Sequence, residues 1–163
     1  MQKRTSKGTS INAAKLPRVY SLMASEMEGR TFVDYGCGRY TQHLQAAAAV
    51  RDAVMLPFDP FNQPEEVNAA TIAAKAAADF AICSNVLNVI DDDSAVTACI
   101  ASAVSMGNGT AHFTVYEGNG TGEGQETQHG ESWQRNARLR SYAAFVPAGY
   151  AVTFSRGIMT VTA

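Results

Sequence analysis

The stretch T-F-V-D-Y-G-C-G-R, residues 31–39, decides the fold. Its apolar half is typical of a short buried strand, and Gly36 and Gly38 then allow the sharp turn by which a strand passes into a helix. The acid Asp34 stands two residues before the first glycine. The following helix would present unpaired N–H groups at its N-terminus. A strand, a glycine turn and a helix in this order indicate an α/β protein with a parallel sheet.

Strand and helix patterns alternate outward from this turn. Strands are predicted at 53–58, 79–84 and 111–116, with a terminal pair at 150–154 and 158–162. Helices are predicted at 11–27, 40–49, 65–78 and 133–145, and from Asp93 or Ser94 to Gly107. The sequence therefore predicts a mostly parallel twisted sheet with an antiparallel C-terminal strand. Because Asp59 and Asp79 lie so close in sequence, the strand-and-helix unit often found between them should be shortened or missing.

The composition is that of a folded protein, with 163 residues, 46% hydrophobic and 17% charged. This length suits one domain over 11–163, preceded by a basic flexible tail at 1–10. The chain has no apolar run of bilayer length and no signal-peptide pattern, so we expect a cytoplasmic protein. The three cysteines form no C-x-x-C pair and the three histidines are scattered, so no metal site or disulfide framework is predicted.

The charge is close to balanced, at −2, which argues against a strongly nucleic-acid-binding surface. Basic residues nevertheless gather in 3–18 and in the predicted helix at 133–145. These groups are either solvated faces or contacts for a phosphate-bearing substrate.

A second group of candidate ligand-binding residues follows the strand at 53–58. Asp59 lies 21 positions after Gly38, where a carboxylate can accept from both hydroxyls of a ribose. Pro60 and Phe61 come next, and an apolar side chain there can pack on an adenine face. The simpler alternative for Asp59 is a turn acid before proline.

The segment D-F-A-I-C-S-N-V-L-N-V-I-D-D-D, residues 79–93, contains the third group. Its strand ends at Ser84 and Asn85, and an open parallel sheet binds ligands at the carboxyl ends of its strands. The apolar residues that follow should pack inward, which leaves Asn85 and Asn88 to point into a cleft. The alternative is that both asparagines cap the loop backbone.

Together these three groups resemble the first, second and fourth motifs of class I S-adenosylmethionine-dependent methyltransferases, over roughly residues 31–93. More narrowly, D-Y-G-C-G, F-D-P-F, C-S-N-V-L-N-V-I and W-Q-R-N resemble a little-characterised group of phage and bacterial methyltransferase-like proteins, including those associated with DNA phosphorothioation. The resemblance implies a Rossmann-like fold with Asp34, Gly36, Cys37 and Gly38 near the methionine moiety and Asp59 on the ribose. It also implies that Cys83, Ser84 and Asn85 lie beside the sulfonium. The usual third glycine is Tyr40 here.

The expected function is methyl transfer from S-adenosylmethionine to a small-molecule, nucleotide or nucleic-acid acceptor, with S-adenosylhomocysteine as product. The [D/N/S]-P-P-[Y/F/W] sequence of many amine-directed nucleic-acid methyltransferases is absent, and Ser84-Asn85-Val86-Leu87 stands there instead. The candidate catalytic residues are Asn88, Glu117, His129, Gln134 and Arg135. The glycine-rich loop 117–131 is predicted to close over the substrate.

Two other classes remain open at this point. A non-catalytic protein that sequesters or senses S-adenosylmethionine would use the same cofactor residues. An NAD-dependent oxidoreductase is disfavoured by the missing third glycine. No membrane partner is expected, and the chain should be a monomer or a homodimer.

Overall fold

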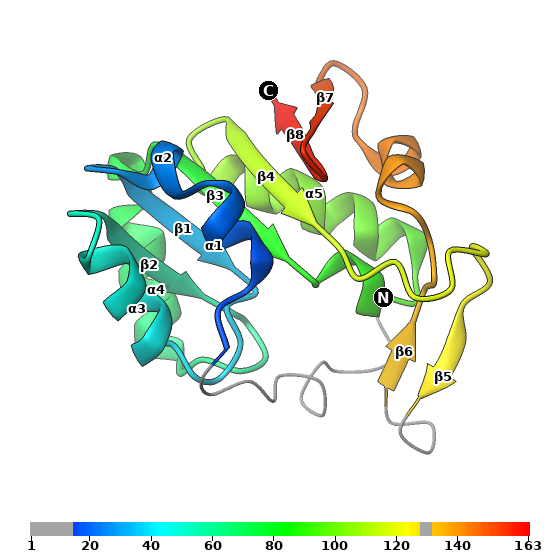
Figure 1. Cartoon of the computed structure of the whole chain (residues 1–163), viewed down its shortest axis with the longest axis horizontal. Coiled ribbons are helices and arrows are strands. Elements are labelled where there is room, and N and C mark those ends of the chain that lie inside the picture. The colour runs from blue at the N-terminus through cyan, green and yellow to red at the C-terminus, as the bar shows by residue number, and fades with distance from the viewer. Residues whose placement is uncertain (1–14, 128–131) are drawn as a thin grey trace.

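The computed structural model describes residues 15–127 and 132–163. A six-stranded sheet runs through it in the order β2-β1-β3-β4-β8-β7 (Figure 1). Its strands are β1 (Thr31–Tyr35), β2 (Val54–Phe58), β3 (Phe80–Ser84), β4 (Thr110–Thr114), β7 (Ala151–Ser155) and β8 (Ile158–Thr162). The first four strands are mutually parallel, and β8 runs antiparallel to both β4 and β7. The predicted mostly parallel α/β sheet with an antiparallel C-terminal strand is confirmed.

The helices are short apart from one. They are α1 (Arg18–Leu22), α2 (Ala24–Met27), α3 (Gln42–Ala49), α4 (Glu65–Ala74) and α5 (Asp93–Met106), with 3-10 turns η2 (Lys75–Ala77), η3 (Leu87–Val89) and η5 (Leu139–Phe145). Asp92, rather than Asp93 or Ser94, caps α5, because its carboxylate accepts from the backbone N–H of Ala95 at 2.8 Å. Only α4 and η2 join β2 to β3, so the strand expected to be shortened or missing is missing.

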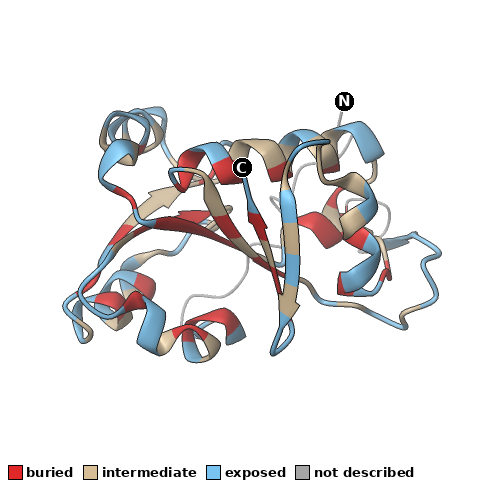
Figure 2. Ribbon diagram, turned by 90° about the horizontal axis from the view of Figure 1, so that it is seen from above, coloured by how far each residue is buried: buried red, intermediate tan, exposed pale blue. Residues whose placement is uncertain are grey.

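Helices cover both faces of the sheet, and Figure 2 shows the buried central strands between two layers whose outer sides are exposed. Successive residues of β1 point to opposite faces. Val33 packs with α5 and η5 in one core, and Phe32 packs with α1, α2 and α3 in the other. Because both faces of β1 are buried, the strand is apolar along most of its length.

The chain changes direction and face after β2. From β1 to β2 it moves outward through α3, on the same face as α1 and α2. It then returns through α4, which lies behind the sheet with α5 in the view of Figure 1, and pairs β3 with the other side of β1. Connections on opposite faces leave a crevice at the carboxyl ends of β1 and β3, which is where open α/β sheets bind their ligands.

One predicted helix is confirmed in part and another is wrong. Of the region 11–27, residues 11–14 lie outside the described residues, and the helix begins at Arg18, after Pro17, and is interrupted at Met23. The helix predicted at 133–145 is instead the strand β6 (Ser132–Gln134), an irregular stretch and η5. Asn136 interrupts it with φ of 56°, a left-handed conformation that no helix accommodates.

The predicted glycine-rich loop is partly a hairpin. Its residues Gln125–Thr127 form β5, which pairs antiparallel with β6 (Figure 1). Gly122 donates its N–H to the carbonyl of Asn136 at 2.8 Å, and the side chain of Asn136 donates to the carbonyl of Glu123 at 3.0 Å. These bonds tie the described part of the loop to the segment after β6, and its closure over a substrate stays a prediction.

The terminal strand pair is confirmed, with its turn at Arg156 and Gly157. Their φ angles of 50° and 78° are those of the two-residue hairpin turn whose twist suits the strands. In the described ranges, no helix is long and apolar enough to cross a membrane.

Candidate functional site

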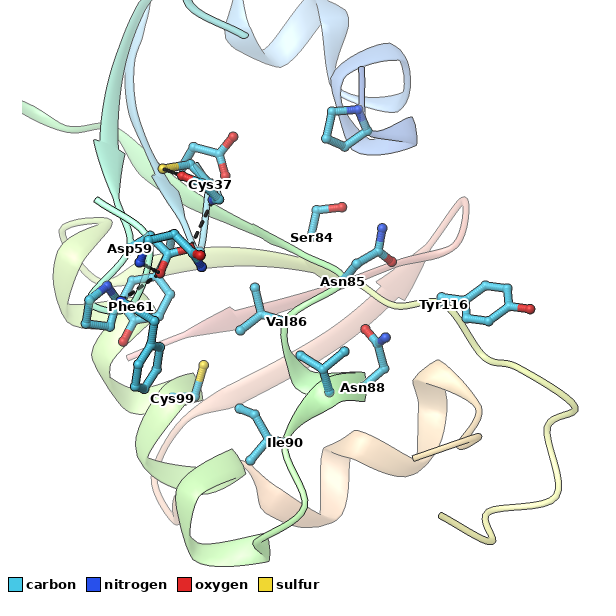
Figure 3. Close-up of a pocket in the computed structure, with 18 of the residues that line it drawn as sticks. Cys37, Asp59, Phe61, Ser84, Asn85, Val86, Asn88, Ile90, Cys99 and Tyr116 are labelled. Atoms are coloured by element: carbon cyan, nitrogen blue, oxygen red, sulfur yellow. Dashed lines mark hydrogen bonds between the residues drawn. The ribbon is translucent and has the colours of Figure 1, made fainter. Parts of the chain in front are cut away.

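A cavity of about 1280 Å³ opens at the carboxyl ends of β1, β2 and β3 (Figure 3). Its floor comes from the turns after these strands and one wall comes from α5. Most of the predicted cofactor residues line it: Asp34, Gly36, Cys37, Gly38, Asp59, Pro60, Phe61, Ser84 and Asn85. The three groups of candidate residues, which are separate in the sequence, therefore meet in the crevice at the ends of β1 and β3.

The turn after β1 requires its two glycines. Gly36 and Gly38 have φ of 80° and 77°, which side chains on L-residues rarely allow. The N–H of Gly36 donates to the carbonyl of Phe58 at 2.7 Å and so joins the ends of β1 and β2. A Cβ on Gly36 would also overlap the side chain of Val86. At Gly36 and Gly38 the turn therefore presents its backbone to the cavity, with no side chain in between.

Asp34 lies buried beneath this turn, with only 3% of its surface exposed. Tyr20 of α1 donates its hydroxyl proton to Oδ2 of Asp34 at 2.8 Å. Burial raises the pKa of Asp34 to about 7, although the Tyr20 hydrogen bond lowers it and the nearby Asp59 raises it. The carboxyl therefore changes charge near neutral pH, and no positive side chain contacts it among the hydrogen bonds found in the described residues.

Asp59 lies at the end of β2, and the chain itself occupies both of its oxygens. Oδ1 accepts from the backbone N–H groups of Phe61 and Asn62 at 2.9 and 3.0 Å. Oδ2 accepts from the N–H of Gly38 and the side-chain amide of Asn62, both at 3.0 Å. A carboxylate has about four lone-pair sites, so all are used. Asp59 therefore links the β1 and β2 turns, and it meets a ribose only if one of these donors is replaced.

The end of β3 gives a mixed result for the residues predicted beside the sulfonium. Ser84 and Asn85 line the cavity, and Asn85 takes φ of 58° while its N–H donates to the carbonyl of Thr114. Cys83 does not line the cavity. Its side chain points to the α5 side of the sheet and is fully buried, where burial raises the pKa of its thiol. The period-2 alternation of the strand, which the motif alone did not resolve, explains the difference.

The candidate catalytic residues separate into two groups. Asn88 and Gln134 line the cavity, and the Nδ2 of Asn88 donates to Oε1 of Gln134 at 3.2 Å. Glu117 and Arg135 do not line it. Glu117 accepts from the N–H of Leu139 at the start of η5. His129 lies outside the described residues.

Arg135 is a structural residue in this geometry. Its guanidinium donates twice to the carbonyl of Ile90, at 3.1 and 3.0 Å, and pairs with Asp93 at 2.7 Å. The ring of Phe145 lies 5.3 Å from its guanidinium carbon. These contacts hold the segment after β6 against the turn after β3 and the start of α5. The guanidinium therefore stabilises the fold.

Sequence reasoning did not assign several cavity residues. Lys15 and Arg18, from the start of α1 and the residues before it, line the cavity, and so does the exposed Tyr116, whose carbonyl accepts from Gln134. Small side chains of α5 complete the wall: Ala95, Ala98, Cys99 and Ser102. The basic residues of the N-terminal region were a signal for the first group. The α5 wall had no signal, because its alanines are equally typical of any helix.

Fold and site together define an α/β protein with a cavity at the point where the strand order reverses. Compared with known proteins, the chain matches no family model, and a search of curated proteins returned no match. Within the part of the chain that the structure describes, no group of three or more His, Cys, Asp or Glu could hold a metal ion.

Proposed function

We propose that this protein is an S-adenosylmethionine-dependent methyltransferase with its cofactor in the cavity at the ends of β1, β2 and β3. The observation that carries the proposal is the buried acid Asp34 beneath a two-glycine turn at the sheet's reversal point. A pyrophosphate at such a turn would meet an acid, whereas a ligand with an ammonium group would meet a partner of opposite charge.

The charges around the turn suit an amino-acid zwitterion. Asp34 would face the ammonium group of the methionine moiety, and Lys15 and Arg18, which line the same cavity, would face its carboxylate. The sequence segments that supply these charges, α1 and its approach on one side and β1 on the other, are held together by the Tyr20–Asp34 hydrogen bond. This pairing supports an amino-acid-bearing cofactor over a dinucleotide.

The other half of the cavity suits a nucleoside. The ring of Phe61 is 47% exposed and lines the cavity, so a purine can pack against its face. Small α5 side chains opposite leave room for it. Of the four donors to Asp59, the amide of Asn62 is the one carried on a side chain rather than on backbone. A ribose hydroxyl would take its place.

S-Adenosylmethionine supplies an already activated methyl group when bound, so the protein's task is alignment and exclusion of water. The glycine turn and Asp34 would fix one end of the cofactor, and Phe61 and the Asp59 turn would fix the other. Ser84 and Asn85, at the end of β3 between these two groups, would border the reacting region. No side chain in this arrangement is required to form a covalent bond.

Isothermal titration calorimetry with S-adenosylmethionine, S-adenosylhomocysteine, NAD and NADP tests the proposal. We expect the two sulfur compounds to bind and the two dinucleotides not to bind. S-Adenosylhomocysteine at 100 times its dissociation constant should add about 2.7 kcal/mol to the free energy of unfolding and raise the melting temperature by several degrees. Absence of any effect at millimolar concentration would remove the proposal.

Two variants sharpen the assignment. Asp34→Asn keeps the size of the side chain and should weaken S-adenosylhomocysteine binding by roughly tenfold at pH 7.5, the value of about one charge-assisted hydrogen bond. Asp79→Asn, an exposed carboxylate that accepts from the N–H of Thr31 outside the cavity, is the matched control and should bind normally. Binding without methyl transfer to any acceptor would indicate a cofactor-binding protein rather than an enzyme.

A further inference from the structure

The nitrogen and the oxygen of the Asn88 side-chain amide, in η3, differ in their hydrogen bonding. Tyr116 offers only a backbone carbonyl to Gln134, so Nε2 of Gln134 is the donor, at 3.0 Å. Oε1 of Gln134 must then accept, and it does so from Nδ2 of Asn88 at 3.2 Å. This relay fixes the orientation of the Asn88 amide, because a flipped amide would set two acceptors against each other.

The oxygen of Asn88 is consequently directed away from Gln134. Asn88 is 3% exposed, and its Oδ1 is buried without a hydrogen-bond partner in the described part of the chain. Figure 3 shows this oxygen on the side of Asn85 and Ser84, while the nitrogen lies on the side of Tyr116. A buried unpaired acceptor is costly in a folded protein and marks a place where a ligand donor gains a hydrogen bond.

The cavity wall on the nitrogen side of Asn88 is aromatic, rich in amides and uncharged. A second cavity of about 340 Å³ adjoins the first and shares Val89, Tyr116 and Gln134 with it. None of the residues that line it is charged; they include Trp133, Gln125 and Asn136. Tyr116 is 65% exposed and lines both cavities, so its ring is available for stacking. Such a wall suits a planar, neutral ring better than a phosphate or a carboxylate.

We propose that Asn88, Gln134 and Tyr116 form the acceptor site, and that the acceptor is a nucleobase whose exocyclic amino group donates to Oδ1 of Asn88. The inference rests on the proposed methyltransferase function. The amino nitrogen would form the new bond to the methyl carbon with its lone pair as the carbon–sulfur bond breaks and leaves its electrons on sulfur. The nitrogen then releases one proton to water, while its other N–H stays on Asn88.

The single tryptophan of the chain provides a direct readout, because Trp133 lines the second cavity. Its fluorescence is followed in protein saturated with S-adenosylhomocysteine, so that a nucleoside cannot enter the cofactor half. Adenosine is compared with purine riboside, which lacks the amino group, and cytidine with its 4-deamino analogue. We expect at least one amino compound to bind roughly tenfold more tightly than its partner, as one hydrogen bond to a buried acceptor allows.

Variants test the assignment to these residues. Asn88→Leu should bring the two members of the pair to within about twofold of each other, consistent with loss of one hydrogen bond. Tyr116→Ala, at an exposed position that leaves the core intact, should weaken both members together by about tenfold through loss of stacking. Gln45→Leu removes an exposed side-chain amide from α3 and should change neither affinity.

The outcomes separate the two proposals. If calorimetry shows that S-adenosylhomocysteine does not bind, the proposed function fails and this inference fails with it. If it binds normally but wild-type protein does not discriminate within either pair, or keeps its discrimination in Asn88→Leu, this inference alone is overturned. A single-stranded oligonucleotide with the preferred base identifies the source: tighter binding than the nucleoside assigns the base to a nucleic acid, and weaker binding assigns it to a free nucleoside or nucleotide.

Discussion

At the scale of single residues, position 36 requires glycine for two reasons that can be separated by experiment. Its φ is positive, and a Cβ there would overlap the side chain of Val86. Gly29 has φ of 67° but open space around it, so it shares the first requirement only. Gly29→Ala should therefore cost about 1–2 kcal/mol in free energy of unfolding, the cost of a left-handed conformation for a residue with a side chain.

Gly36→Ala should cost about 1–3 kcal/mol more than Gly29→Ala, because overpacking against Val86 adds to the strained φ. Urea unfolding of the two variants measures the difference. It should be accompanied by loss of S-adenosylhomocysteine binding in Gly36→Ala and normal binding in Gly29→Ala. Equal destabilisation of the two would mean that the contact with Val86 relaxes and that the turn is less tightly closed than its geometry indicates.

Two buried tyrosines make opposite use of their hydroxyl groups. The hydroxyl of Tyr142 is buried without a hydrogen-bond partner in the described residues, and burial raises its pKa to about 12. Tyr142→Phe should therefore be neutral or stabilise the fold by up to about 1 kcal/mol, since no hydrogen bond is lost. Tyr20 instead donates to Asp34. Tyr20→Phe should cost about 1.5–3 kcal/mol at pH 8, where the acceptor is charged, and less at pH 5.

Denaturant unfolding at both pH values distinguishes these cases. The expected sign follows from the Tyr20 hydrogen bond, which lowers the pKa of Asp34 and therefore favours its ionised form. A Tyr20→Phe cost that does not change with pH would show that Asp34 keeps one protonation state over this range. Destabilisation in Tyr142→Phe would reveal a partner for that hydroxyl.

At the scale of elements, Asp59 makes the connection between the turns after β1 and β2. Asp59→Asn removes the charge and places an amide N–H₂ against backbone N–H donors on either side, whichever way the amide turns. We expect a loss of about 3 kcal/mol in free energy of unfolding, the sum expected for weakened charged hydrogen bonds and unsatisfied buried donors. Asp79→Asn, at an exposed carboxylate with one acceptor bond, should cost less than about 1 kcal/mol.

Calorimetry on the same variants tests how Asp59 contributes to the site. If Asp59 acts only through the turns, cofactor affinity should fall in proportion to the lost stability and recover in osmolyte that restores the fold. If it also accepts from a ribose, affinity should stay low when the fold is restored. A fully stable Asp59→Asn protein would contradict the four hydrogen bonds that define its position.

The features that could be predicted from the sequence are those set by local residue patterns, and the features that could not are set by contacts between distant segments. All six strands of the main sheet were predictable, because each is an apolar or alternating run that ends at a turn or a loop. The strand β6 was not, because Ser132–Gln134 becomes a strand only through its partner Gln125–Thr127. The glycine turn and Asp34 were predictable as a candidate site, whereas the side of the sheet to which Cys83 points and the contribution of α5 to the cavity wall depend on tertiary packing.

At the scale of the whole molecule, one reversal of the chain explains why the site exists. Since α3 leads outward on one face and α4 and α5 lie on the other, no helix of the described residues crosses the ends of β1 and β3. The cavity that results places a buried acid under its floor. That acid is unfavourable for the fold when it is ionised, so stability and ligand binding should respond to pH in opposite directions.

Asp34 is the residue on which both responses depend. Its pKa rises from 3.8 to about 7 on folding because of burial, so the folded protein holds this proton more tightly than the unfolded chain. Its contribution to stability is therefore full below about pH 4 and is lost as the pH rises through about 7. Relative to Asp34→Asn, the free energy of unfolding of the wild type should fall by up to roughly 4 kcal/mol between pH 4 and pH 8.

Cofactor affinity should run the other way. Ionisation of Asp34 as the pH rises from 5 to 7.5 creates the partner for an ammonium group, so wild-type protein should bind S-adenosylhomocysteine progressively more tightly while Asp34→Asn stays weak and flat. Urea unfolding and calorimetry across this range measure the two curves on the same samples. Parallel stability curves for wild type and variant would mean that Asp34 is ionised throughout. A wild-type affinity that ignores pH while the stability curves diverge would move the ammonium group to another part of the cavity, because the carboxyl would then titrate without meeting the ligand.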